Sequence, residues 1–77
     1  MVEEGAMIRL SNDEALVLFE FLARFCDEKK ALAIEDASER RVLCDILCQL
    51  ESILVEPFAT DYRDLLGKAR NRVAQNR

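Results

Sequence analysis

The sequence predicts an all-α protein, a bundle of three helices preceded by a short N-terminal arm. Three observations support this fold class. Leu, Ala, Glu and Arg dominate the 77 residues, whereas Gly occurs twice and Pro once, a composition that favours helices. Apolar residues recur with helical spacing in three segments. Each of these segments is preceded by residues that commonly cap a helix.

The arm is predicted over residues 1–10 and the first helix over residues 12–28. Ser11 and Glu14 form a capping box, in which each side chain accepts a hydrogen bond from the backbone N–H of the other residue. A broad apolar face follows, which we expect to lie in the core. This face comprises Ala15, Leu18, Phe19, Leu22, Ala23 and Cys26.

Residues 29–35 are predicted to connect the first helix to the second. Leu32 and Ile34 indicate that this connector covers one end of the core, because a fully solvated loop would not carry two large aliphatic residues. A short strand in this segment is an alternative.

The second helix is predicted over residues 36–55, with Asp36 as its N-cap and Glu39 completing a capping box. Pro57 prevents the helix from continuing. The helix carries a main apolar stripe, which we assign to the core, and a weaker apolar line, so we expect it to contact both other helices. The main stripe comprises Val42, Leu43, Ile46, Leu47, Leu50, Ile53 and Leu54, and the weaker line comprises Ala37, Cys44, Cys48 and Val55.

The third helix is predicted over residues 60–74, with Thr60 as its N-cap and Asp61 in its first turn. Gly67 either allows a neighbouring helix to approach closely or has no special role, and we favour the second interpretation. A single apolar stripe predicts a surface helix docked on the other two. That stripe comprises Tyr62, Leu65, Leu66, Ala69 and Val73.

The side-chain inventory argues against catalysis. The chain contains no histidine, which is the commonest general base and the commonest activator of a Ser or Cys nucleophile. Cys26, Cys44 and Cys48 are an odd number of cysteines on helices, so we expect reduced thiols that pack as small apolar side chains. They lack a fourth zinc ligand. We therefore predict that the protein is not an enzyme and holds no metal or cofactor.

The charge distribution argues against nucleic acid as the ligand. Residues 1–60 contain 13 acidic and 6 basic residues, and residues 61–77 contain 2 acidic and 5 basic residues. An acidic body suits a basic protein partner, although acidity also simply keeps small proteins soluble. The acidic N-terminus does not resemble a signal peptide, and Glu20 and Arg24 interrupt the longest apolar run. We therefore expect a cytoplasmic protein that does not enter a membrane.

One apolar pair lies on the polar side of the first helix. Val17 and Phe21 are close to charged residues there, and we expect both to be partly exposed in an acidic surround, as in a protein-binding patch. The alternative is that Met7 and Ile8 of the arm fold over them. The candidate partner-binding residues are Val17, Glu20, Phe21, Arg24, Asp27 and Glu28.

Three stretches of the sequence resemble a group of short helical bacterial proteins. They are IRLSNDEALVLFEFL at residues 8–22, EDASERRVL at residues 35–43 and LVEPF at residues 54–58. The pattern resembles all-α immunity proteins encoded beside secreted polymorphic toxins. The similarity is closest to those that neutralise nuclease toxins of the contact-dependent growth inhibition type, including EndoU-like ribonucleases.

The resemblance implies an immunity protein that binds a cognate toxin domain, expected to be basic, and blocks its active site or substrate groove. The matched residues Ser11, Asp13, Glu14 and 56–58 have structural roles, as helix caps and a helix stop. The alternative is a homo-oligomeric helical adaptor or regulator with no toxin partner, in which Val17 and Phe21 pack against a symmetry mate. In the toxin-binding case we expect a monomer or weak homodimer when the protein is free.

Overall fold

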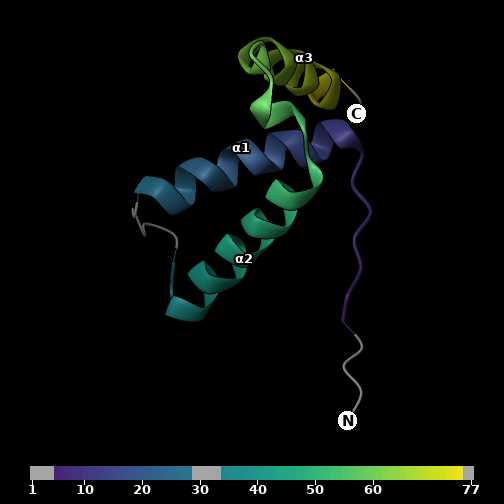
Figure 1. The fold of residues 1–77 in the computed structure, drawn as a ribbon. Coiled ribbons are helices and arrows are strands. Elements are labelled where there is room, and N and C mark those ends of the chain that lie inside the picture. Colours follow the sequence, from purple (N-terminus) through teal and green to yellow (C-terminus); the bar gives the residue numbers. More distant parts are fainter. Residues whose placement is uncertain (1–4, 29–33, 76–77) are drawn as a thin grey trace.

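The structure is a computed structural model that describes residues 5–28 and 34–75. These residues form α1 (Asn12–Glu28), α2 (Ala37–Ile53), the 3-10 turn η1 (Glu56–Phe58) and α3 (Tyr62–Gln75), with no strand among them (Figure 1). The predicted all-α three-helix bundle is confirmed. Each helix begins and ends within two residues of its predicted bounds. Most of the predicted connector, residues 29–33, lies outside the described part of the chain.

Two of the predicted helix starts are built as expected. The backbone N–H of Ser11 donates to Glu14 Oε1 over 2.8 Å, and the N–H of Glu14 donates to Ser11 Oγ over 3.0 Å. Asp36 caps α2 by accepting from the N–H of Ser38 over 2.8 Å. These bonds satisfy N–H groups that have no partner within the helix. The second box is shifted by one residue, because Glu39 accepts from the N–H of Glu35 rather than of Asp36.

The third helix starts later than predicted. The residues after Leu54 turn through η1, with Pro57 at its start, and α3 begins at Tyr62 rather than at Thr60. The backbone carbonyl of Asp61 accepts from the N–H groups of Asp64 and Leu65, so Asp61 precedes the helix instead of lying in its first turn. The proline is accommodated in η1. Thr60 and Asp61, which the sequence pattern assigned to the helix, lie in the turn between η1 and α3.

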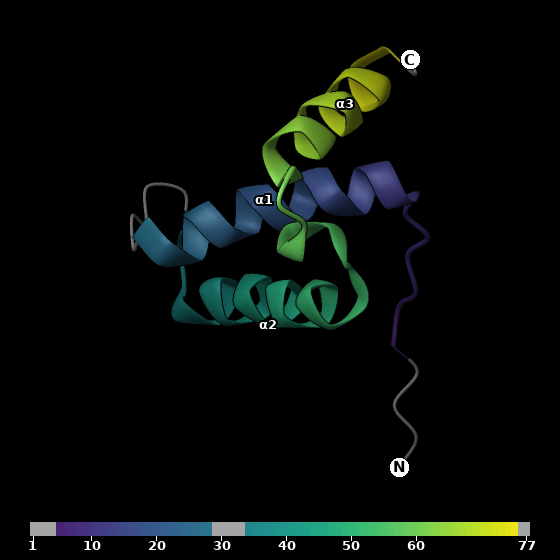
Figure 2. The same ribbon diagram turned by 45° about the horizontal axis from the view of Figure 1, so that its top comes forward.

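The middle helix is α1, and not α2 as the two apolar lines of α2 predicted. α1 packs against α2 on one side and against α3 on the other (Figures 1 and 2). α3 also packs on η1. Leu16 shows the consequence, because it is only 2% exposed although it lies outside the predicted core face of α1. Docking of α3 buries this additional line of side chains.

The core is small and centred on α1. Its buried residues are Leu16, Phe19, Leu22, Leu50, Leu54, Leu66 and Ala69. The predicted stripe of α3 is confirmed at Leu66 and Ala69, whereas in α2 the predicted core residues Val42 and Ile53 are mostly exposed. At about 100° per residue both lie at the same margin of the α2 stripe, and the packing against α1 leaves this margin open. A Cβ added at Gly67 meets no atom, so close helix approach does not account for this glycine.

The described part of the arm, residues 5–10, runs away from the helices (Figures 1 and 2). Met7 is 99% exposed and Ile8 is 82% exposed. The alternative in which these two residues fold over Phe21 is therefore wrong. The capping box at Ser11 explains the geometry, because it sets the direction in which the chain leaves α1.

Candidate protein-binding groove

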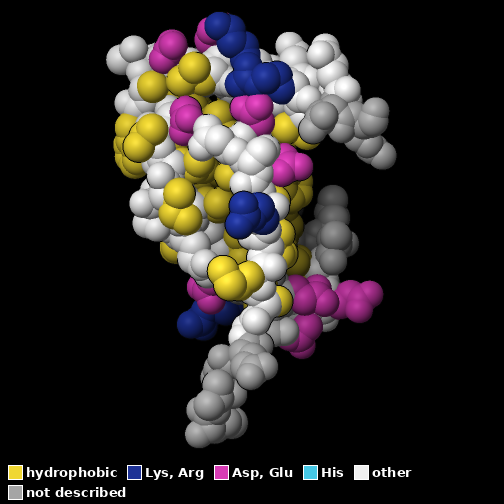
Figure 3. Space-filling view, turned by 90° about the vertical axis from the view of Figure 1, so that its right-hand side faces the viewer, with side chains coloured by type: hydrophobic (Ala, Val, Ile, Leu, Met, Phe, Trp, Pro, Cys, Tyr) yellow, Lys and Arg dark blue, Asp and Glu magenta, His cyan; other side chains and the backbone are white. Residues whose placement is uncertain are grey.

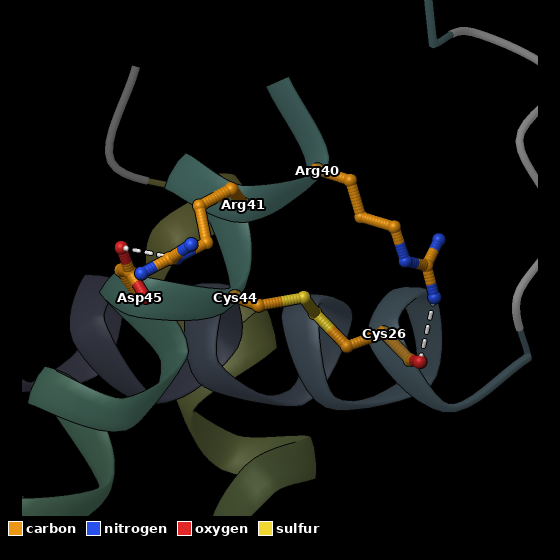
Figure 4. The surroundings of a disulfide bond; sticks show 5 residues. All are labelled: Cys26, Arg40, Arg41, Cys44 and Asp45. Atoms are coloured by element: carbon orange, nitrogen blue, oxygen red, sulfur yellow. Dashed lines mark hydrogen bonds and ion pairs between the residues drawn. A yellow bond between two sulfur atoms is a disulfide. The ribbon is translucent and has the colours of Figure 1, made fainter. Parts of the chain in front are cut away.

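A disulfide joins α1 to α2 beside the candidate site (Figure 4). Cys26 and Cys44 form the bond, with their Cα atoms 6.1 Å apart. The expectation of three reduced thiols is thus wrong for these two residues, because an odd number of cysteines still allows one pair. Cys48 is free and exposed. The guanidinium of Arg40 donates to the Cys26 carbonyl over 2.8 Å and adds a second link between the helices.

An apolar groove lies between α1 and the first half of α2. Phe21 and Phe25, one helical turn apart, stack with ring centroids 6.2 Å apart and an interplanar angle of 21°. The opposite side is formed largely by Val42 and Leu43, and the hollow measures about 530 Å³. We call this hollow the aromatic groove. Its lining residues are Phe21, Phe25, Ile34, Ser38, Glu39, Val42 and Leu43.

Two arginines flank the aromatic pair. The guanidinium carbon of Arg24 lies 5.8 Å from the ring centroid of Phe21, and that of Arg40 lies 5.4 Å from the centroid of Phe25. Both distances are within the range of a cation–π contact. The arginines therefore hold both rings at the surface, and the apolar hollow lies between the rings and the side chains of α2. Phe21 remains 51% exposed.

The structure separates the residues predicted for partner binding. Glu20 faces α3, where it accepts a hydrogen bond of 2.8 Å from the hydroxyl of Tyr62 and pairs with Arg24 at 3.7 Å. Val17 is partly buried against the core. Phe21 and Arg24 do lie together, although Arg24 lines the neighbouring hollow rather than the aromatic groove. Asp27 is exposed, and the side chain of Glu28 lies outside the described part of the chain.

Asp27 belongs to a second hollow between the same two helices. This hollow measures about 550 Å³, and Asp27 and Glu51 provide its acidic side chains. Its lining residues are Phe19, Ala23, Arg24, Cys26, Asp27, Leu47 and Glu51. The acidic surround expected around Phe21 is therefore displaced: acids and aromatic rings occupy two neighbouring hollows instead of one patch.

The α1–α3 contact perturbs one titratable group strongly. Burial raises the pKa of Tyr62 to about 12, and the hydrogen bond to Glu20 and the charge of that carboxylate add to the increase. At the start of α1, Arg72 donates two hydrogen bonds to Asp13, at 2.7 and 2.8 Å, and lowers the pKa of that carboxyl. Both interactions hold helices together, so neither marks a reactive group.

Phe25 and the disulfide were missed by the sequence analysis. The signal for Phe25 was its spacing of four residues from Phe21, which places two rings on one helix face. Val42 was assigned to the core, although it forms an open wall. No comparable signal exists for the disulfide, because pairing depends on which face of α1 meets α2.

Two further features of the described residues concern metal ions and membranes. Within residues 5–28 and 34–75, no three Cys, Asp or Glu side chains are placed to hold a metal ion. No helix of the described chain combines the length and the apolar character that a membrane crossing requires. In comparisons with known proteins, no family model, no curated protein and no solved structure matches the chain.

Proposed function

We propose that this protein acts by binding another protein through the aromatic groove. The observation that carries the proposal is the half-exposed Phe21, stacked on Phe25 over an apolar hollow. Large aromatic side chains held rigidly at the surface are typical anchors of protein interfaces, because they bury much apolar area with little loss of side-chain freedom. Arg24 and Arg40 restrict the two rings further.

We propose that the partner is a toxin domain and that the chain is its immunity protein. The resemblance of residues 8–22, 35–43 and 54–58 to such proteins supports this choice. The charge also supports it: Asp27 and Glu51 are exposed beside the groove, and a toxin that cleaves nucleic acid presents a basic surface. An apolar anchor next to exposed acids would occlude such a surface. Neutralisation then requires no chemistry from this chain.

Co-expression with the protein encoded immediately upstream tests the proposal. The wild-type chain is expected to protect cells and to co-purify with the toxin domain. The variant Phe21→Ser is expected to weaken the complex by about 2 kcal/mol or more, roughly thirtyfold, because it removes the anchor. Phe58→Ser is the matched control, because Phe58 is also an exposed aromatic residue but lies outside the groove. Isothermal titration calorimetry measures both affinities.

Reversing Asp27 and Glu51 to Lys tests the electrostatic part, with a weaker salt dependence of binding as the expected result. The reversal avoids Glu20, since its bond to Tyr62 makes it a structural residue. Absence of both protection and complex formation argues against the toxin partner. Equal losses for Phe21→Ser and Phe58→Ser argue against the groove.

The redox state belongs in the same test. An immunity protein works in the cytosol, where thiols are kept reduced, whereas the structure pairs Cys26 with Cys44. We expect the reduced protein to retain binding, because neither cysteine of the disulfide lines the groove that Phe21, Phe25 and Val42 form. Affinities measured with and without reductant check this expectation.

A second candidate is a homo-oligomeric adaptor with no toxin partner. The open groove also favours this function, because Phe21 and Val42 are half-exposed and would bury against a symmetry mate. Light scattering of the wild type and of Phe21→Ser separates the two candidates, because only the adaptor requires the groove for self-association. Loss of an oligomer in Phe21→Ser, without any toxin present, would favour the adaptor.

A further inference from the structure

The exposed hydrophobic side chains of the described residues fall into two groups. Two of the eight large ones belong to the aromatic groove, Phe21 and Val42. The other six lie in the arm, at the last residue of α2 and in the turn after α2. They are Met7, Ile8, Leu10, Ile53, Val55 and Phe58. The proposed function uses the first group and leaves the second without a role.

These six side chains share one end of the molecule, which we call the arm end. The side chain of Asn12, at the start of α1, donates a hydrogen bond of 2.7 Å to Glu56 of η1, so the base of the arm is tied to the turn. The arm and the turn after α2 also lie on the same side in both ribbon views (Figures 1 and 2). Figure 3 faces this side and shows hydrophobic side chains exposed between a few charged ones.

We propose that the arm end is a homodimer interface, in which the arm of each copy packs on the turn of the other. The occupant is a second copy because both complementary parts are present in one chain. The arm offers Met7 and Ile8, and the turn offers Val55 and Phe58, all of them mostly exposed. A twofold axis then makes the contact twice, and the assembly closes at two copies.

The exposed apolar area of the arm end is of the order that a homodimer interface needs. Large aliphatic and aromatic side chains each bury on the order of 100 Å². The six side chains of the arm end therefore offer several hundred Å² per chain, the same order as the about 800 Å² that one partner contributes to a specific interface. Isolated exposed hydrophobic residues offer far less area than this cluster of six.

The arm of the same chain does not take this place in the structure. Residues 5–10 run away from the helices, and Phe58 is 75% exposed. The capping box at Ser11 holds the direction of departure, so folding back would require a sharp reversal next to the cap. An arm that points outward is instead suited to exchange between copies.

The test is the oligomeric state of the full-length chain in a Cys48→Ser background, which prevents dimers linked through the exposed thiol. Sedimentation velocity over about a hundredfold range of concentration should show a reversible dimer. The arm variant Met7→Ser/Ile8→Ser and the turn variant Val55→Ser/Phe58→Ser should each weaken dimerisation by about tenfold or more, since each removes exposed apolar anchors. The groove variant Phe21→Ser/Val42→Ser is the matched control and should dimerise normally.

A mixing experiment distinguishes exchange from folding back. The arm variant keeps an intact turn and the turn variant keeps an intact arm, so a mixture should form a heterodimer with one of the two contacts. A strictly monomeric parent protein would overturn the proposal, as would dissociation by the groove variant alone. A monomer whose thermal stability falls in the arm variant would show that the arm covers its own turn, which also overturns it. Toxin binding is measured separately, so failure here leaves the proposed function unaffected.

Discussion

The most informative single residue is Tyr62, which connects α3 to α1. It lies at the start of α3, and its hydroxyl donates to the carboxylate of Glu20 over 2.8 Å. Sequence reasoning placed Tyr62 on the buried stripe of α3, which is correct, but assigned Glu20 to a partner surface. The periodicity of α1 marks Glu20 as polar and therefore outward. Only the position of α3 shows that a polar side chain is needed there to accept from a partly buried hydroxyl.

This pair predicts a specific pH dependence. Burial and the neighbouring Glu20 raise the pKa of Tyr62 from its ordinary 10.0 to about 12. The folded state thus holds its proton more tightly, and this contribution to stability is complete below pH 10 and is lost as the pH rises to 12. Tyr62→Phe should remove this alkaline loss of stability. Thermal melts between these pH values measure the effect.

The pKa itself can be measured directly. Tyr62 is the single tyrosine, and the chain has no tryptophan, so tyrosinate absorbance reports this residue alone. Glu20→Gln removes the charge and should lower the pKa part of the way, because burial remains. Glu51→Gln, an exposed acid on α2, is the control and should leave it unchanged. A normal pKa in the wild type would contradict the proposed α1–α3 contact.

At the scale of the elements, the helices themselves follow from local signals, whereas their pairing does not. The capping pairs at Ser11 and Asp36 define two starts, and Pro57 ends the second helix. Such signals act within a few residues of the chain and are therefore visible in the sequence. The disulfide between α1 and α2 depends on which faces meet. The spacing of Cys26 and Cys44 carries no information on that.

The disulfide predicts a difference between two otherwise similar cysteines. It links residues 18 apart and restricts the unfolded chain, a constraint worth about 3 kcal/mol. Cys44→Ser should therefore lower the free energy of unfolding by about that amount in oxidised protein. Cys48→Ser, one turn along the same helix, is the control and should have little effect, because Cys48 is exposed and free. Urea denaturation measures both values.

Reductant supplies a second check of the same prediction. It should bring the wild type close to Cys44→Ser and should leave that variant unchanged. If wild type and Cys44→Ser unfold at the same urea concentration without reductant, the bond does not form in solution.

At the scale of the whole molecule, the fold class could be predicted from the sequence, but the arrangement around α1 could not. Leu16 was missed and Val42 and Ile53 were wrongly assigned to the core. Helical periodicity gives the width of an apolar face but not the identity of the helix that covers it. For the same reason, only one of the two aromatic residues of the groove could be predicted. Phe21 was correctly expected to be exposed, whereas Phe25 depends on the shape of the opening between α1 and α2.

The central position of α1 has a consequence for the order in which the molecule opens. The α1–α2 half contains the disulfide, and α2 with its C-cap contributes the buried residues Leu50 and Leu54. The α1–α3 half buries Leu66 and Ala69 of α3 and adds the surface pair of Asp13 and Arg72. The two outer helices thus bury comparable side chains against α1, and the halves differ in the covalent link, which opposes separation of α1 and α2 but not of α1 and α3. We therefore expect α3 to open before α1 and α2 separate.

Native-state hydrogen exchange tests this order. Amide protons of α3 should exchange faster than those of the disulfide-linked pair, and Asp13→Asn should accelerate α3 further while leaving α2 unchanged. Asp45→Asn is the matched control, because it removes an exposed ion pair with Arg41 that lies entirely within α2. The effect of Asp13 should also fade at low pH. Arg72 lowers the pKa of this carboxyl below its ordinary 3.8, so the stabilisation is complete above pH 3.8 and is lost as the pH falls and the carboxyl is protonated. Equal exchange in all three helices would instead indicate one cooperative unit, in which the disulfide stabilises α3 as well.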